Sequence, residues 1–186
     1  MDVQVTNQRI DHLGIIAGVI QDIDLIRKID VLIPTDSREK ITTGQAVAAM
    51  ILNGLGFSDR PLSLTPQFFE NKAMSLLLGE AVAPELLNRF KLGRALDDCY
   101  DYGCDRLFAC LSAQICQQEG ILTNYLSLDS TSFSVTGEVY EDSDEHAIEI
   151  THGYSKDHRS DLKQVVLDLL CTHDAGIPLM SKSYNG

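Results

Sequence analysis

The stretch Leu126-Ser127-Leu128-Asp129-Ser130-Thr131-Ser132-Phe133 decides the fold class, because the character of the sequence changes there. β-Forming residues dominate from Ile121 to Val135 and no helix-capping residue precedes them, which predicts a strand. Asp129 stands inside this strand, although aspartate is unfavourable in strand interiors. By side-chain alternation it faces away from Leu126 and Leu128. The stretch therefore predicts a β part of the chain that carries one conspicuous carboxylate.

The residues before this strand, 1–120, have the pattern of a helical domain. From Ile10 to Ile29 apolar residues recur at spacings of three and four, which predicts a helix with a break near Asp22–Asp24. Thr42 or Thr43 can cap a further helix, because Gln45 stands close to the position that reaches back to a cap. Later helices are expected from Pro66 to Gly79, after Pro84, and over Gly93–Tyr102 and Asp105–Glu119, the last two separated at Gly103.

The residues after the strand continue the β pattern. Ala147–Thr151 favours a short strand. The run Leu162–Thr172 fits a helical face, but a turn signal at His173–Gly176 and a second apolar run at Ile177–Met180 favour a hairpin. We therefore expect an α+β chain, with a helical N-terminal domain over 1–120 and a sheet domain over 121–186.

Composition limits the possible functions. The 186 residues carry a net charge of −12, whereas proteins that bind nucleic acid usually show a basic surface. No apolar run is long enough for a membrane span and no signal peptide is visible, so we expect a cytoplasmic protein without a membrane partner. The chain has five cysteines, and this odd number argues against a disulfide framework and favours structural thiols.

Asp129 is the first candidate for chemistry, and two interpretations of it remain open. It can be a metal ligand or nucleophile at a sheet surface, because a charge among apolar neighbours needs a compensating partner. It can equally be an aspartate at a strand end, bonded to nearby turn hydroxyls. Phosphatases of the haloacid-dehalogenase type and aspartic proteases fit poorly, since Thr131 replaces the second Asp of the former motif and the Gly of the latter.

The second candidate is the polar run His152–Asp161, which concentrates basic and hydroxyl groups in an acidic half of the chain. Lys156 and Arg159 can contact phosphates, and the alternative is a polar surface loop. His152 and His158 do not make a metal site by themselves, because no third ligand stands at a recognisable spacing.

Both candidates lie in motifs that resemble DDE-type bacterial insertion-sequence transposases of the insertion-sequence-four superfamily. Tyr125–Phe133 is similar to the first catalytic strand of that group. Thr151–Gln164 resembles its Gly-Tyr-Ser-Lys-Asp-His-Arg-Pro-Asp-Leu-Lys-Gln signature, with Ser160 where the family usually has Pro. The helical half is similar to the uncharacterised domain that opens one branch of these transposases, through Ile10–Ile15, Asp36–Ile41, Leu52–Phe57 and Gln67–Glu70.

The resemblance implies a ribonuclease-H-like core whose first three strands lie in 121–186. Asp129 would be a catalytic residue and metal ligand, one of three carboxylates that hold two Mg²⁺ or Mn²⁺ ions for DNA cleavage and strand transfer. Lys156, His158 and Arg159 would contact DNA. The partners would be the terminal inverted repeats of the element, and full-length transposase or a second copy of the chain.

The departure from the family pattern is that its second Asp and its Glu would fall beyond Gly186. We therefore expect a truncated transposase that cannot complete its metal site and is inactive alone. Two alternatives remain. The chain is a DNA-binding or regulatory fragment, for which the segment Arg38–Phe57 is a hypothetical recognition element, or it is a non-functional remnant.

Overall fold

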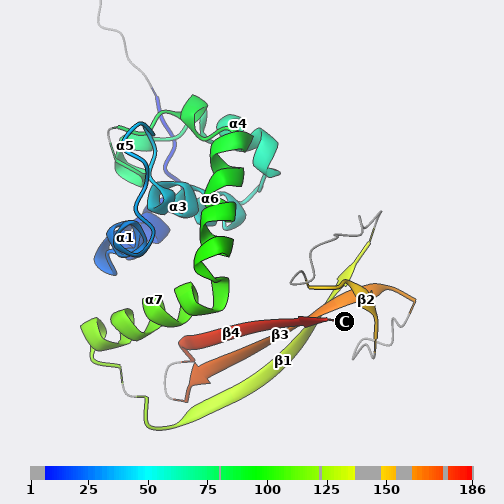
Figure 1. The fold of residues 1–186 in the computed structure, drawn as a ribbon. Helices are drawn as coiled ribbons and strands as arrows, with labels where there is room; N and C mark the ends of the chain where they lie inside the picture. The colour runs from blue at the N-terminus through cyan, green and yellow to red at the C-terminus, as the bar shows by residue number, and fades with distance from the viewer. Residues whose placement is uncertain are drawn as a thin grey trace, which may run out of the picture. The chain divides into compact units, whose positions relative to one another are not determined.

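The computed structural model describes residues 7–79, 81–121, 123–136, 148–153, 161–173 and 176–185. Helices come first and an antiparallel sheet follows, so the predicted α+β class is confirmed (Figure 1). The chain divides into two compact units, Met1–Leu107 and Phe108–Gly186. The division falls inside the last helix, whereas the boundary predicted between 120 and 121 lies just beyond that helix.

The first unit is built from short helices. They are α1 (Leu13–Asp22), α2 (Leu25–Leu32), α3 (Thr43–Gly54), η1 (Leu62–Leu64), α4 (Thr65–Phe69), α5 (Met74–Leu77), η2 (Pro84–Leu86) and α6 (Arg89–Tyr102), followed by α7 (Cys104–Glu119), which crosses the division. No helix in the described part of the chain is long and apolar enough to cross a membrane.

Local sequence signals set most helix ends, as predicted. The break between α1 and α2 falls at Asp24, whose φ of +53° is left-handed backbone that ends a helix. Thr42 caps α3: its hydroxyl accepts from Gln45 N at 3.0 Å, and Thr42 N donates to the Gln45 side chain at 3.0 Å. Gly103, with φ +95°, separates α6 from α7.

The single helix predicted over Pro66–Gly79 is wrong. The structure has two short helices there, α4 and α5, separated by a turn and an isolated β-bridge at Lys72. This segment pairs with Arg9 near the N-terminus: Arg9 N donates to Asn71 O at 2.8 Å, and Ala73 N donates to Arg9 O at 3.0 Å. A contact across more than sixty residues thus overrides the helical period of the local sequence.

The core of the first unit lies around α3, which packs against α2 and α6. Its contact with α2 needs a glycine, because a Cβ at Gly44 would lie 2.3 Å from the Ile26 carbonyl oxygen. The fully or nearly buried apolar side chains of this core come from α1, α3, α4, α5 and α6 and from the segments between helices: Leu13, Ala17, Ile20, Ile41, Ala46, Ala48, Ala49, Leu52, Phe69, Met74, Leu77, Leu78, Val82, Leu87, Leu92 and Ala95.

The second unit contains an antiparallel sheet of β1 (Leu126–Val135), β2 (Thr151–His152), β3 (Lys163–Thr172) and β4 (Pro178–Asn185). β3 is central: it pairs with β1 on one side, and with β4 and the short β2 on the other. The hairpin predicted over Leu162–Met180 is therefore confirmed as β3 and β4. The sequence left the first of these runs ambiguous because β3 carries apolar residues on both faces.

The described thiols are all free, so no disulfide joins any of the five cysteines. Cys99 and Cys116 are buried, and Cys104 is exposed. Burial raises the pKa of the Cys99 thiol above its ordinary value, which suits a structural rather than a reactive role.

Candidate functional site

Asp129 lies in the interior of β1, opposite Leu169 of β3. Its side chain is exposed, and the carboxylate has no hydrogen-bond or ion-pair partner among the described residues. The interpretation as a strand-end aspartate held by turn hydroxyls therefore does not apply. Because the carboxylate is exposed and has no partner among the described residues, it is available to a ligand.

The residues that share a face with Asp129 follow from the register, because cross-strand partners point to the same side of a sheet. They are Ser127, Thr131, Phe133 and Val135 on β1, His152 on β2, Lys163, Val165, Leu167, Leu169 and Cys171 on β3, and Ser181, Ser183 and Asn185 on β4. None of them is a second carboxylate. Asp168 belongs to the opposite face, with Ser130 and Lys182 as its neighbours.

A divalent cation does not fit this set of residues. Mg²⁺ and related ions need near-complete oxygen coordination, with one or two carboxylates as the anchor, and a two-metal site needs more. Within the described ranges, no group of three or more His, Cys, Asp or Glu residues could hold a metal ion. Asp129 is thus one possible ligand and not a metal site.

The predicted DNA-contacting residues Lys156, His158 and Arg159 lie outside the described residues. The neighbouring His152 is exposed at the end of β2, where it pairs with Lys163 of β3. The role of this motif stays a prediction.

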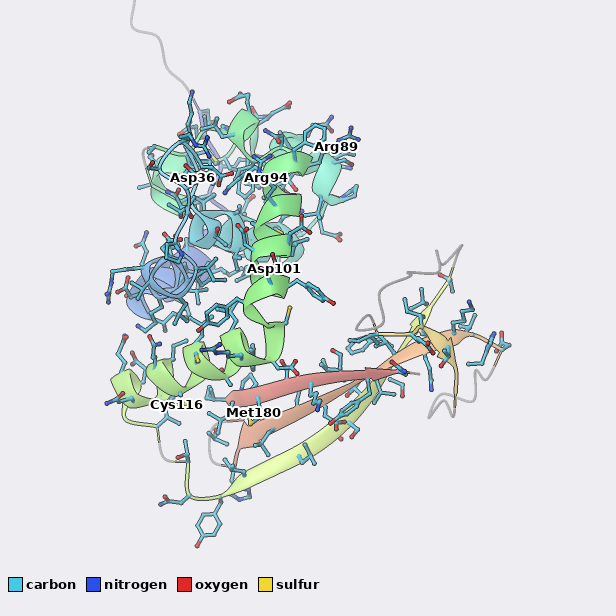
Figure 2. The ribbon with its side chains drawn as sticks, in the orientation of Figure 1. Asp36, Arg89, Arg94, Asp101, Cys116 and Met180 are labelled. Atoms are coloured by element: carbon cyan, nitrogen blue, oxygen red, sulfur yellow. The ribbon has the colours of Figure 1, made fainter. Side chains whose placement is uncertain are left out.

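Three cations near the start of α6, Arg38, Lys91 and Arg94, are already paired with carboxylates. Lys91 donates to Glu39 Oε2, and Arg94 Nε donates to Glu39 Oε1 at 3.1 Å. Lys91 first, and then Arg94, lowers the pKa of the Glu39 carboxyl below its ordinary value. Arg38 donates three side-chain hydrogen bonds to Asp36 and lowers the pKa of that carboxyl (Figure 2 labels Asp36 and Arg94). These three cations are therefore largely neutralised, and the buried pair of Lys91 and Glu39 stabilises the fold.

The second unit holds an apolar cavity of about 540 Å³ beside the sheet. Cys116 of α7 and Met180 of β4, both labelled in Figure 2, are part of its lining, together with Leu126 and Leu170. No described charged side chain lines it, so it offers no group for acid–base chemistry.

A different cavity, in the first unit, combines cations with aromatic rings. It has a volume of about 470 Å³, and we name it the Phe57 pocket. It lies between Arg9, the start of α1, the loop after α3, and α4. Its lining is Arg9, Asp11, His12, Leu13, Gly56, Phe57, Ser58, Arg60, Gln67, Phe68 and Lys72.

Two contacts fix the loop that carries Phe57 and Arg60. The buried Asn53 accepts from Arg60 N at 2.9 Å and donates to Arg60 O at 2.6 Å. Gly56 lies against the Phe68 ring so closely that a Cβ there would be 2.6 Å from it. The loop is therefore held in one position relative to the pocket.

His12 closes the pocket from the side of α1. Its Nε2 donates to Leu55 O at 2.7 Å, and its ring lies 4.0 Å from that of Phe57. Its Nδ1 is buried and has no hydrogen-bond partner. The first turn of α1, which starts at Leu13, contains no acidic residue and no side-chain cap, and the nearest carboxylate before it in the sequence is Asp11.

The hypothesis that Arg38–Phe57 is a recognition element changes with the structure. Its helix, α3, is confirmed, but no residue from Thr43 to Asn53 is exposed, so the helix has no free face for a DNA groove. The exposed parts of the segment are its start, at Arg38 and Lys40, and its end, where Phe57 reaches the pocket. No local sequence pattern indicated this pocket, because Arg9, Phe57, Arg60 and Lys72 follow no regular spacing.

The structure thus combines a helical N-terminal unit, which contains the Phe57 pocket, with a sheet in which Asp129 is exposed on β1. Residues 5–113 match the family model described as Domain of unknown function (DUF4277). Because this match covers more than half of the chain, the protein belongs to that family. No curated protein and no solved structure matches the chain.

Proposed function

We propose that this chain is the N-terminal portion of a DDE-type DNA transposase, which cleaves and joins the DNA ends of an insertion sequence. The observation that carries the proposal is Asp129, an exposed and unpaired carboxylate in the interior of β1. It stands in a motif that resembles the first catalytic strand of these enzymes. The DUF4277 match over the helical half agrees with the resemblance without naming an activity.

The arrangement of the sheet supports the proposal. The proposed core is ribonuclease-H-like and begins with three antiparallel strands, for which β1, β3 and β4 are the candidates. β1 pairs only with β3 among the described strands, so its other edge is free for a further strand. In the proposed core, that added strand would carry a second carboxylate beside Asp129.

The chain by itself should not cleave DNA. Cleavage with two metal ions needs several carboxylates, and among the described residues Asp129 is the only carboxylate on its face of the sheet. Mg²⁺ or Mn²⁺ therefore belongs to a completed site and has no fitting place among the described residues.

The first test is to sequence the DNA that follows the codon for Gly186. The proposal expects a continuation that encodes a strand with an Asp and then a helix with a Glu, flanked by inverted repeats. If no reading frame of the downstream DNA encodes such a strand and helix, the catalytic interpretation of Asp129 is refuted.

The second test uses the protein joined to that continuation, with Asp129→Ala as the variant and Asp168→Ala as the matched control. Asp168 lies in the same sheet, on the opposite face. Cleavage of inverted-repeat DNA should fall by more than about 100-fold in Asp129→Ala, because even an outer-shell partner of a metal contributes about 10- to 100-fold. The control should keep its activity. Equal activity of both variants would contradict the proposal.

The second candidate function is DNA binding by the helical unit, as a binding or regulatory fragment. The Phe57 pocket favours it, since three cations and one carboxylate line a cavity beside an exposed aromatic ring. A mobility-shift assay with duplex carrying the flanking repeats tests this function, and no shift between about 0.05 and 0.15 M salt would count against it.

A further inference from the structure

We infer that the Phe57 pocket binds an unpaired nucleotide of a DNA strand. Its base stacks on Phe57, and its phosphate contacts Arg9, Arg60 and Lys72. The inference rests on the proposed function in one respect, namely that the chain acts on DNA. It does not depend on Asp129, because the pocket belongs entirely to the first unit.

The charge of the pocket favours a phosphate. Neither the Arg9 nor the Arg60 side chain has an ion-pair partner among the described residues. Lys72 lies 3.4 Å from Asp11, which is the only carboxylate among the described residues of the lining. Arg38, Lys91 and Arg94, by contrast, are paired with the carboxylates of Asp36 and Glu39.

The start of α1 forms one side of the pocket through His12 and Leu13. The buried His12 Nδ1 has no hydrogen-bond partner, although buried polar atoms are rarely left without one. Because Nε2 donates to Leu55 O, Nδ1 is the acceptor of the ring, so it suits an N–H donor of a base and adds nothing to the attraction for a phosphate.

Phe57 favours a base. Its side chain is 85% exposed, which is unusual for a large aromatic residue that a rigid loop holds in place. The ring contacts His12 in a tilted arrangement, and most of its surface is exposed to a planar partner. Bases stack on such rings in proteins that bind single strands, where basic side chains contact the backbone between them. The volume of about 470 Å³ lies in the range of small-molecule sites, roughly 300–1,000 Å³.

An unpaired nucleotide fits better than an intact duplex. The faces of a paired base are covered by its neighbours in the stack, so Phe57 can reach only a base that has left the helix or was never paired. Duplex recognition usually inserts a helix into the major groove, but the buried α3 next to the pocket has no free face for that.

The test measures the affinity of the 186-residue chain for a fluorescein-labelled oligothymidylate of about 8 nucleotides, by fluorescence anisotropy at about 50 mM salt. A duplex of equal length is the comparison. The variants are Phe57→Ala and Arg60→Gln. The controls are Phe90→Ala, an exposed phenylalanine on α6, and Arg38→Gln, an exposed arginine already paired with Asp36. Thermal melting verifies that each variant is folded.

Binding of the single strand should exceed binding of the duplex, and each pocket variant should weaken it by at least about fivefold. The two controls should stay within twofold of the wild type. Thymidine monophosphate should displace the probe at lower concentration than inorganic phosphate, because only the nucleotide offers a ring to Phe57.

Three outcomes would overturn the inference, and they separate it from the proposed function. If the chain binds the duplex and Phe57→Ala leaves that affinity unchanged, nucleotide binding in the Phe57 pocket is refuted, whereas DNA binding by the chain is retained. No binding of either probe would remove the pocket and the DNA-binding candidate together. Equal losses in Phe57→Ala and Phe90→Ala would show nonspecific adhesion. Conversely, pocket-dependent binding in a protein whose cleavage does not need Asp129 would keep the pocket and refute the catalytic proposal.

Discussion

Replacing Glu39 by Gln should destabilise the first unit strongly, although this residue lies on the surface side of the core. Its carboxylate is the partner of Lys91, whose side chain is only 5% exposed. Gln keeps the size and an accepting oxygen but removes the negative charge. The buried ammonium group of Lys91 is then left without compensation, which is costly in a region of low dielectric constant.

The size of the effect follows from the burial of the two partners. Removing one partner from a buried ion pair costs about 3–5 kcal/mol. Glu39 is itself 23% exposed and Gln can still accept a hydrogen bond, so we expect the lower end of that range, about 3 kcal/mol. For a unit of this size, the melting temperature should fall by about 12 °C or more. Arg94, which is 59% exposed, adds less than about 1 kcal/mol to the same carboxylate.

The assay is urea and thermal unfolding of the full chain, followed by circular dichroism at the helix band. Asp36→Asn is the matched control, because it breaks an ion pair of good geometry that is exposed, and its midpoint should not move. The double variant with Glu39→Gln and Lys91→Met should regain most of the loss, since it removes the buried charge as well. A chain without any cooperative transition would instead support a non-functional remnant.

The pH dependence gives the sharpest check. Lys91 holds the pKa of Glu39 below its ordinary value in the folded protein. The stabilisation is therefore complete above the ordinary pKa of a glutamate, about 4.3, and is lost as the pH falls through the lowered value. The free-energy gap between wild type and Glu39→Gln should thus be constant near neutral pH and shrink in acid below about pH 4. A gap that is absent at neutral pH, or that widens in acid, would refute the reasoning.

Two further substitutions test how the first unit is held together. Gly44→Ala should lower the free energy of unfolding in urea by about 3 kcal/mol, because its Cβ would lie 2.3 Å from Ile26 O. The control is Gly54→Ala on the same helix, where the Cβ would meet open space and the free energy of unfolding should not fall. Asn53→Ala should cost about 1–3 kcal/mol by leaving the backbone groups of Arg60 unsatisfied, and hydrogen exchange at the Arg60 amide should become faster. Protection of that amide unchanged in Asn53→Ala would contradict the role of Asn53 in holding the loop.

The helix ends that could be predicted are those decided by neighbouring residues. The capping box at Thr42 involves only Thr42 and Gln45, and the break at Gly103 needs only a residue that tolerates positive φ. The turn before Gly176 likewise marked the β3–β4 hairpin, although the apolar spacing of β3 also fits a helix. Signals of this kind are complete within a few residues, so a single sequence contains them.

The features that could not be predicted depend on distant residues. The separation of α4 from α5 needs Arg9, whose backbone pairs with the segment between them. The Phe57 pocket likewise joins Arg9, the loop after α3 and Lys72, which only the packing of the helices brings together. The position of Asp129 in a strand was predictable from the local pattern. That no hydroxyl group bonds to its carboxylate could not be predicted, because this depends on the register of β1 against β3.

The acidic composition and the proposed nucleotide pocket together predict an unusual salt dependence. At physiological ionic strength, charges further than about 8 Å apart are largely screened, so the local cations of the pocket act almost independently of the net charge of −12. Near 0.01 M salt the screening length grows to about 30 Å, and the carboxylates of the whole chain then repel the strand. High salt weakens the phosphate contacts themselves.

Affinity for a single strand should therefore pass through a maximum at intermediate salt. Arg60→Gln should lower that maximum without changing the salt range in which repulsion reduces the affinity. An affinity that rises steadily down to the lowest salt would mean that the repulsion is negligible. The net charge would then carry no weight against binding of nucleic acid by this chain.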